Sequence, residues 1–143
     1  MSKLFLIAQL AGRAVAIESG QVESVVDIGA IVPVPCVDRQ VRGLAALRSR
    51  VVTVIDSRAA LGLPPAEIAA TRAVITLAEG HHYAILVDSL EDVAPFDLAP
   101  LSSGIVLDAG WRATGCGIVE RDGEAILAID LRALVPGLTA IAA

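Results

Sequence analysis

The sequence repeats itself, and this repeat is its strongest constraint on the fold. Residues 12–25 (GRAVAIESGQVESV) align without gaps to residues 80–93 (GHHYAILVDSLEDV). Further on, VVTVIDSRAALGL recurs as AILAIDLRALVPGL, so that Asp56 matches Asp130. A repeated order of strand-like segments predicts two copies of one small β-unit in a compact protein. We therefore interpret residues 1–143 as a single domain with approximate internal copies 1–66 and 67–143.

Strand signals dominate both copies. Short apolar segments rich in β-branched residues alternate with turn residues, and such spacing is typical of small closed or nearly closed β-barrels. Glycine-containing turns, including Asp122-Gly123, indicate tight hairpins. The predicted strands are 4–10, 14–18, 21–28, 51–55, 73–77, 83–87, 90–94, 115–120 and 125–129.

Helical signals are few. Asp56 precedes SRAAL and Gly62, a pattern that predicts a short helix with an aspartate N-cap and a glycine stop. Asp130 precedes LRALV in the same way. Residues 64–71 form the junction between the copies, and residues 95–112 have few strand signals and are predicted to be a mobile loop. The expected fold class is all-β with a few short helices.

Composition narrows the function. Hydrophobic residues make up 55% of the chain and aromatic residues 3%, so the core is built from Val, Ile, Leu and Ala, with apolar surface to spare for partners. The net charge of −5 and the single lysine, Lys3, argue against nucleic-acid binding. No apolar segment reaches the roughly 20 residues of a membrane-spanning helix. Cys36 and Cys116 have no CxxC spacing, and we expect two buried free thiols in a cytoplasmic protein.

Candidate catalytic and metal-binding residues do not form a convincing site. Asp56 and Asp130 could meet at a pseudo-twofold axis and share a proton, which leaves an aspartic-type hydrolase as an alternative. Neither aspartate is followed by the Thr/Ser-Gly of that chemistry, so helix capping is the favoured interpretation. His81 and His82 would point to opposite faces of an extended chain, unsuited to a common metal. The sequence predicts no enzyme, no cofactor and no metal site.

A set of ordered motifs then resembles a known family. Its most specific part runs Val41-x-Gly43-Leu44-x-x-Leu47-Arg48-x-x-Val51-Val52-x-Val54-Ile55-Asp56-x-Arg58. Supporting matches are Pro33-x-Pro35, Leu61-Gly62-Leu63, Thr71-Arg72, Val87-Asp88-Ser89-Leu90-x-x-Val93 and Asp122-Gly123. Over almost the whole chain, these motifs resemble the chemotaxis coupling protein family, the CheW-like domains.

The resemblance implies two similar five-stranded β-barrels packed about a shared hydrophobic core. It also implies a non-enzymatic adaptor that couples the cytoplasmic tips of methyl-accepting chemoreceptors to the regulatory domain of a CheA-type histidine kinase. Other CheW-like domains are further candidate partners. Such a protein would be cytoplasmic and recruited to membrane-associated receptor arrays without inserting into the membrane. A peptide- or subunit-binding β-barrel scaffold outside chemosensing is the alternative.

The same resemblance maps a receptor or kinase interaction surface onto six residues: Val25, Asp27, Ile28, Gly43, Leu47 and Arg48. A structural role competes at some of them, because Val25 matches Val93 in the repeat and Gly43 could serve only an unusual backbone angle. Ala46 and Ser49 stand where the family has Asn and Gly, and both departures bear on the shape of that turn. The sequence assigns neither the kinase-binding residues nor the pathway's output.

Overall fold

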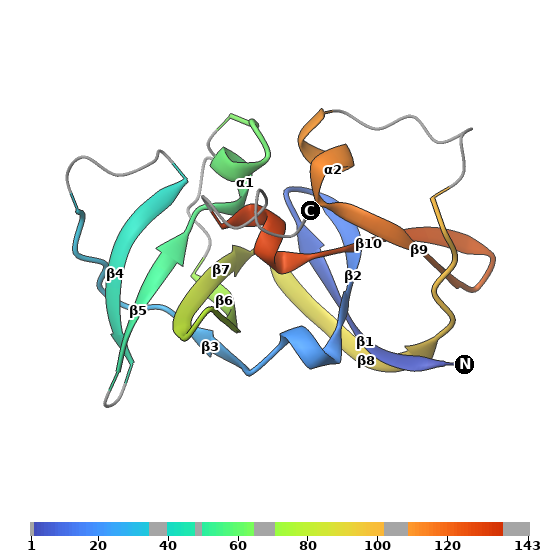
Figure 1. Cartoon of the computed structure of the whole chain (residues 1–143), viewed down its shortest axis with the longest axis horizontal. Coiled ribbons are helices and arrows are strands. Elements are labelled where there is room, and N and C mark those ends of the chain that lie inside the picture. The colour runs from blue at the N-terminus through green and yellow to red at the C-terminus, as the bar shows by residue number, and fades with distance from the viewer. Residues whose placement is uncertain (1, 35–39, 48–49, 65–70, 102–108, 136–143) are drawn as a thin grey trace.

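The structure is a computed structural model that describes residues 2–34, 40–47, 50–64, 71–101 and 109–135. Within these residues ten strands form two five-stranded sheets, which occupy the two lobes seen in Figure 1. Sheet A has the order β8-β1-β2-β10-β9, with bounds β8 (Ser89–Phe96), β1 (Lys3–Leu10), β2 (Arg13–Glu18), β10 (Glu124–Ile129) and β9 (Gly115–Arg121). Sheet B has the order β3-β6-β7-β5-β4, with bounds β3 (Ser24–Asp27), β6 (Arg72–Ala78), β7 (His81–Val87), β5 (Arg50–Ile55) and β4 (Val41–Leu47).

Four short helical elements complete the described chain. They are the 3-10 turn η1 (Ser19–Gln21), helix α1 (Ser57–Ala60), helix α2 (Ala109–Thr114) and the 3-10 turn η2 (Leu131–Leu134). In Figure 1, α1 and α2 lie on the same side of the molecule, one above each lobe. The expected all-β class with two similar five-stranded units is confirmed.

The two sheets have the same strand order once β1 to β5 are exchanged with β6 to β10. Each sheet therefore combines a hairpin from one sequence copy with three strands from the other. Strands of the two copies are joined by two parallel pairs, β10 with β2 and β5 with β7, and by two antiparallel pairs, β1 with β8 and β3 with β6. Because of this exchange the sequence copies interlock, and neither sheet is the product of one copy alone.

The hairpin turns adopt the backbone geometry that the sequence predicts. Three turn pairs have positive φ at both positions: Ala11 (51°) with Gly12 (80°), Glu79 (50°) with Gly80 (80°), and Asp122 (52°) with Gly123 (81°). Positive φ at both central residues matches the right-handed twist of two-residue hairpins. The repeat thus extends to the backbone conformation of the turns.

Each sheet curls toward closure through a segment that returns to its far edge. After β3 the chain crosses over, and Val32 exchanges two backbone hydrogen bonds with Leu44 of β4 (2.8 and 2.9 Å). After β8, Ala99 makes the equivalent pair of bonds with Ile118 of β9 (both 2.8 Å). The first and last strands of each sheet are therefore linked through one continuous segment.

A glycine beside each closing bridge permits this approach. A Cβ atom on Gly43, whose φ is 150°, would lie 2.3 Å from the Val32 carbonyl oxygen. A Cβ atom on Gly117 would lie 2.7 Å from the Ala99 carbonyl oxygen. Both contacts are with backbone, which cannot rotate away, so any side chain at these positions would push the crossing segment off the sheet.

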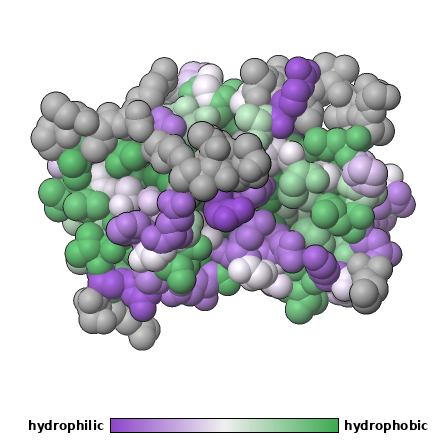
Figure 2. Space-filling model, viewed as in Figure 1, coloured by the Kyte–Doolittle hydropathy of each residue, from purple (hydrophilic) through white to green (hydrophobic). Residues whose placement is uncertain are grey.

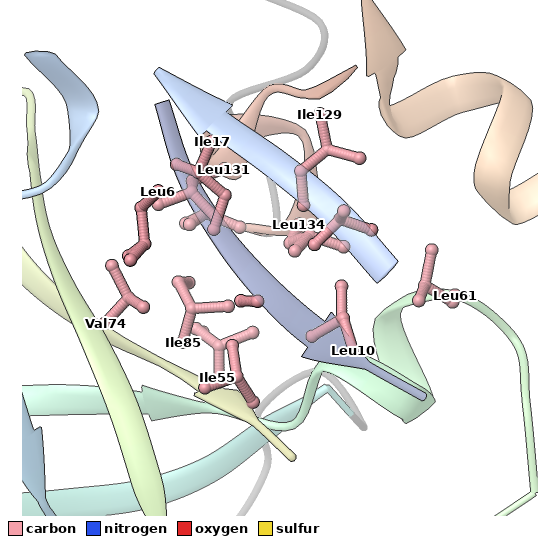
Figure 3. Close-up of a cluster of buried hydrophobic side chains, with 14 of the residues drawn as sticks. Leu6, Leu10, Ile17, Ile55, Leu61, Val74, Ile85, Ile129, Leu131 and Leu134 are labelled. Carbon is pink, nitrogen blue, oxygen red and sulfur yellow. The ribbon is translucent and has the colours of Figure 1, made fainter. Parts of the chain in front are cut away.

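Three apolar clusters hold the fold together. One fills sheet B and includes Val52, Val54 and Ile75, and a second fills sheet A and includes Phe5 and Ile7. The largest lies between the sheets. Figure 3 shows it, with Leu6, Leu10, Ile17, Ile55, Leu61, Val74, Ile85, Ile129, Leu131 and Leu134 labelled. Both sheets and both copies contribute, so the shared hydrophobic core is confirmed.

The sequence interpretation was wrong at several elements. The strand β4 was not predicted, because its residues VRGLAAL include a glycine and two alanines and only one β-branched residue. The region 95–112, predicted to be a mobile loop, contains the end of β8 and the start of α2, while its residues 102–108 lie outside the described part. Pro95 is tolerated in β8 because that strand is at the edge of sheet A. The strand expected over 21–28 is shortened to β3.

We expect Gly43→Ala to destabilise the protein because its methyl group would collide with the Val32 carbonyl. Overpacking of this kind costs about 1–3 kcal/mol. Urea unfolding measures the change, and Gly29→Ala is the matched control because a Cβ atom there meets nothing within 4 Å. Equal unfolding free energies for the two variants would show that the crossing segment can move aside without cost.

Candidate interaction surface

Two of the six residues assigned by resemblance are exposed on β3. Val25 is 36% exposed, and the Asp27 carboxylate pairs with Arg72 Nε of the neighbouring strand at 3.0 Å. That ion pair is itself largely exposed, so Asp27 remains open to a competing basic group on a partner. The edge strand β3 therefore presents one apolar and one acidic side chain side by side along its length.

The other assigned residues have structural positions or lie outside the described chain. Ile28 is 5% exposed and belongs to the cluster inside sheet B, against which the half-buried Leu47 also packs. Gly43 is buried within β4 rather than in a loop; it has the unusual backbone angle that the sequence suggested, with a φ of 150°, and it also leaves room for closure of the sheet. Arg48 is outside the described residues. The structure thus separates surface candidates (Val25, Asp27) from residues that support them.

A second exposed position follows from the repeat. Val93 on β8 is the counterpart of Val25 and is 55% exposed. Val25 pairs across the sheet with Val74, and Val93 pairs with Leu6; both partners belong to the core between the sheets. The two valines therefore lie on the sheet faces that are turned toward the inter-sheet core, at the open edge of each sheet. The repeat alignment of Val25 with Val93 predicts this equivalence, and the structure shows that both positions are exposed.

Sequence reasoning missed an apolar surface around β4. Val32 (65% exposed), Leu44 and Val51 (62% exposed) come together there, since Val32 bridges to Leu44 and Val51 follows the turn after β4. Figure 2 shows apolar surface over the lobe that contains β4 and β5. In sequence these residues could not be told from core residues, because the run Val51–Ile55 is apolar at positions of both faces except Thr53. We call Val32, Leu44 and Val51 the β4 patch.

The most specific motif residues serve the fold. Asp56 caps α1 by accepting a hydrogen bond from the Ala59 amide (3.2 Å) and also pairs with Arg42 Nη2 of β4 (2.8 Å). Arg58 donates from Nε to the Pro64 carbonyl at 2.8 Å. The motif therefore joins the start of α1 to the edge strand β4 and holds the loop that follows α1 in place.

The second repeated aspartate has the same role as the first. Asp130 begins η2 and accepts a hydrogen bond from the Arg132 amide at 3.0 Å. Gly62 ends the α1 segment with a φ of 75°, as the sequence predicted. The capping interpretation of Asp56 and Asp130 is confirmed, and both carboxylates are occupied by local backbone and arginine partners rather than directed at a shared proton.

The adjacent histidines have different environments. His82 Nε2 lies 3.0 Å from a Glu23 carboxylate oxygen, whereas the exposed His81 packs edge-on against Tyr83. Across the described residues, no three of the His, Cys, Asp and Glu side chains gather in a way that could hold a metal ion.

Two ionisable groups are perturbed. Hydrogen bonds from the Gln9 amide (2.6 Å) and from Arg121 (3.1 Å) lower the pKa of the Glu91 carboxyl. A lowered pKa means that this carboxylate stabilises the fold above its unfolded pKa, and that the contribution disappears as the pH falls through the folded value. Partial burial of the sulfur, and the nearby carboxylates of Asp130 and Glu18, raise the pKa of Cys116. Cys116 is a free thiol at the surface, so the expectation of a buried thiol was wrong for it, and Cys36 lies outside the described residues.

We expect Asp56→Ala to lower the free energy of unfolding by more than Asp130→Ala. Each loses a helix cap, worth about 1 kcal/mol, but only Asp56 also leaves an arginine of a neighbouring strand unpaired. Asp56→Asn keeps the cap, because asparagine caps about as well as aspartate, and so reports the Arg42 contribution alone. Chemical denaturation of the three variants measures the differences; equal losses for both alanine variants would contradict a role for the Arg42 pair.

We expect Cys116 to be alkylated by iodoacetamide more slowly at pH 8 than a cysteine in an unstructured peptide. The thiolate is the reactive form, and a raised pKa reduces its fraction at that pH. A Cys36→Ser background leaves Cys116 as the single thiol, and urea-unfolded protein is the control. A rate equal to that of the unfolded protein would contradict the effect of burial.

Comparison with known proteins identifies the fold and the family. No helix in the part of the chain described here has the length and apolar character needed to cross a membrane. No curated protein sequence matches the chain significantly. Among solved structures, the chain is similar to the scaffolding protein TtCheW from Thermoanaerobacter tengcongensis, with a TM-score of 0.81 and 24% sequence identity over 95% of this chain and 94% of that one. The family model for the CheW-like domain matches residues 4–138. With two interlocked five-stranded sheets and this match, the chain belongs to the CheW-like domain family, whose members are scaffolds and adaptors that generally lack enzymatic activity.

Proposed function

We propose that the protein is a non-enzymatic adaptor that couples the cytoplasmic tips of chemoreceptors to the regulatory domain of a CheA-type histidine kinase. The observation that carries the proposal is the presence of two sets of exposed apolar side chains on one CheW-like body. One set consists of Val25 and Val93 on the edge strands β3 and β8, on the sheet faces turned toward the inter-sheet core, and the other is the β4 patch.

The packing of the molecule favours transmission through a rigid body. The core between the sheets includes Ile17 and Ile129 from sheet A, and Ile55 and Ile85 from sheet B, all fully buried. Burial of each such side chain contributes about 1.5–3 kcal/mol. Because this core joins the two sheets, a partner bound to one sheet is held in a fixed orientation relative to a partner bound to the other.

The receptor would contact the valine pair. Val25 and Val93 offer apolar area on the two edge strands, and a helical hairpin that carries apolar residues on one face is a suitable ligand for such a surface. Asp27 adds an acidic group that can exchange its pairing with Arg72 for a basic side chain of the receptor. Ile28 and Leu47 would act beneath this surface by fixing β3 and β4, and Arg48 remains a candidate contact by resemblance.

The kinase would contact the β4 patch. Val32 and Val51 are each more than three-fifths exposed. Exposed apolar side chains that lie together on a surface mark a site where a partner binds. The regulatory domain of a CheA-type kinase is itself expected to be CheW-like, so the contact would join one β-barrel to another. Other CheW-like domains could bind in the same way.

A β-barrel that binds peptides or subunits outside chemosensing is the second candidate. Among the residues that the structure describes, no strand pairs with the outer edge of β3 or of β8, and this favours the second candidate because an extended peptide can add to such an edge as a further strand. Failure to bind any CheA-type regulatory domain, together with binding of an unrelated extended peptide, would favour this candidate over the adaptor.

Calorimetry of the purified protein with the regulatory domain of a CheA-type kinase from the same cell tests the coupling role. We expect micromolar binding that is similar at 50 mM and 500 mM salt, because apolar contacts are not screened as charge pairs are. Absence of binding by a protein that circular dichroism reports as folded would refute the kinase-coupling part of the proposal.

We expect Val25→Asp to weaken binding to a receptor cytoplasmic fragment by about tenfold or more, because it places a charge in an apolar contact, and 1.4 kcal/mol corresponds to a factor of ten. The same variant should bind the kinase domain normally, and Val51→Asp should show the reverse pattern. Leu98→Asp is the control, since Leu98 is 45% exposed but belongs to neither surface. If Val25→Asp and Leu98→Asp lose the same affinity for the receptor, the valine pair is not the receptor surface.

A further inference from the structure

A carboxylate, a guanidinium and an imidazole meet at one end of sheet B. Arg50 Nη1 lies 2.8 Å from Glu23 Oε1, and His82 Nε2 lies 3.0 Å from Glu23 Oε2. The Arg50 guanidinium also contacts His82 Nε2 directly. Glu23 stands just before β3, Arg50 begins β5 and His82 belongs to β7, so the cluster ties three strands together on one side of the sheet.

One ring nitrogen, His82 Nε2, faces both a carboxylate and a guanidinium. A nitrogen that carries a proton can donate to Glu23 but repels the N–H groups of Arg50. A nitrogen without a proton can accept from Arg50 but offers nothing to Glu23. The protonation of this single atom therefore selects its partner.

Other groups around His82 in the described part of the chain do not compete with Glu23 and Arg50 for its Nε2 atom. Across the β6–β7 ladder, His82 pairs with Leu77, which is apolar, and on β7 itself His81 packs against Tyr83 instead. Among the described residues, Glu23 and Arg50 are the charged groups in contact with the imidazole. The side chains are between 23% and 49% exposed, so protons reach the cluster freely while the geometry is still held by three strands.

We propose that His82 is a proton-dependent switch that controls the attachment of Arg50. When the imidazole is neutral, Nε2 accepts a hydrogen bond from Arg50, and the guanidinium is held jointly by His82 and Glu23. When the imidazole is charged, it pairs with Glu23 and repels Arg50, which then keeps only its shared contact with that carboxylate.

The position of Arg50 connects the switch to the β4 patch. Arg50 is the first residue of β5 and pairs with Leu47, the last residue of β4, and the exposed Val51 of the β4 patch comes next in the chain. Release of Arg50 therefore loosens the end of the hairpin that supports the β4 patch. The switch is a property of the fold and goes beyond the proposed function without depending on it.

Nitrogen-15 NMR of the whole protein tests the proposal. At pH 8 we expect His82 Nε2 to have the chemical shift of an unprotonated, hydrogen-bond-accepting nitrogen. As the pH falls to 5, the Arg50 side-chain resonances should shift with the same midpoint as His82. Hydrogen exchange of the Arg50 guanidinium, relative to that of Arg58, should become about two- to fivefold faster, as the loss of an exposed contact of this kind implies.

Two variants make the test specific. His82→Gln should abolish the pH response of Arg50, whereas His81→Gln, which removes a neighbouring histidine outside the cluster, should preserve it. Arg58 is an internal reference because its Nε donates to a backbone carbonyl that does not titrate. A proton on Nε2 at pH 8, an Arg50 signal independent of pH, or a response that survives in His82→Gln would each overturn the proposal.

Discussion

The apolar core between the two sheets is the feature on which the rest of the molecule depends. It receives side chains from both sequence copies, and the parallel pairs β10 with β2 and β5 with β7 close each sheet with strands from the other copy. Removal of a buried isoleucine such as Ile85 would therefore weaken both lobes at once, by a cost of about 2–5 kcal/mol for truncation to alanine. A body built in this way cannot lose one lobe and keep the other.

The family motif is largely a description of how sheet B closes. Gly43 leaves room for the crossing segment, Arg42 and Asp56 join β4 to the start of α1, and Arg58 secures the loop that follows. These residues are required for the fold, whichever partner the protein binds. The fold does not bury Val25, Val93 or the residues of the β4 patch, and these apolar side chains remain exposed.

One departure from the family pattern, Ala46, lies on β4, which pairs with the strand β5 that begins at Arg50. Ala46 is exposed on β4 and pairs with Val51, so its replacement of the usual asparagine enlarges the apolar surface of the β4 patch. Thr53 pairs with Leu44 on one side and with Tyr83 on the other, a central position in sheet B at which a proline would interrupt the ladder. The β4–β5 ladder pairs Gly43 to Leu47 with Val54 to Arg50 and has an irregularity between Val41 and Gly43.

Local sequence determined much of the fold, because hairpin turns, strand propensity and helix caps act over a few residues. The turns at Gly12, Gly80 and Gly123, and the caps at Asp56 and Asp130, were predictable for this reason. The repeat likewise predicted two similar units. Only the tertiary structure decided that the units exchange strands, that the alanine-rich segment of β4 is a strand, and which apolar residues remain exposed. Those outcomes depend on contacts between residues far apart in the chain, such as Val32 with Leu44 and Glu23 with His82, and in a sequence this rich in Val, Ile, Leu and Ala the apolar pattern alone does not distinguish a core residue from a surface that awaits a partner.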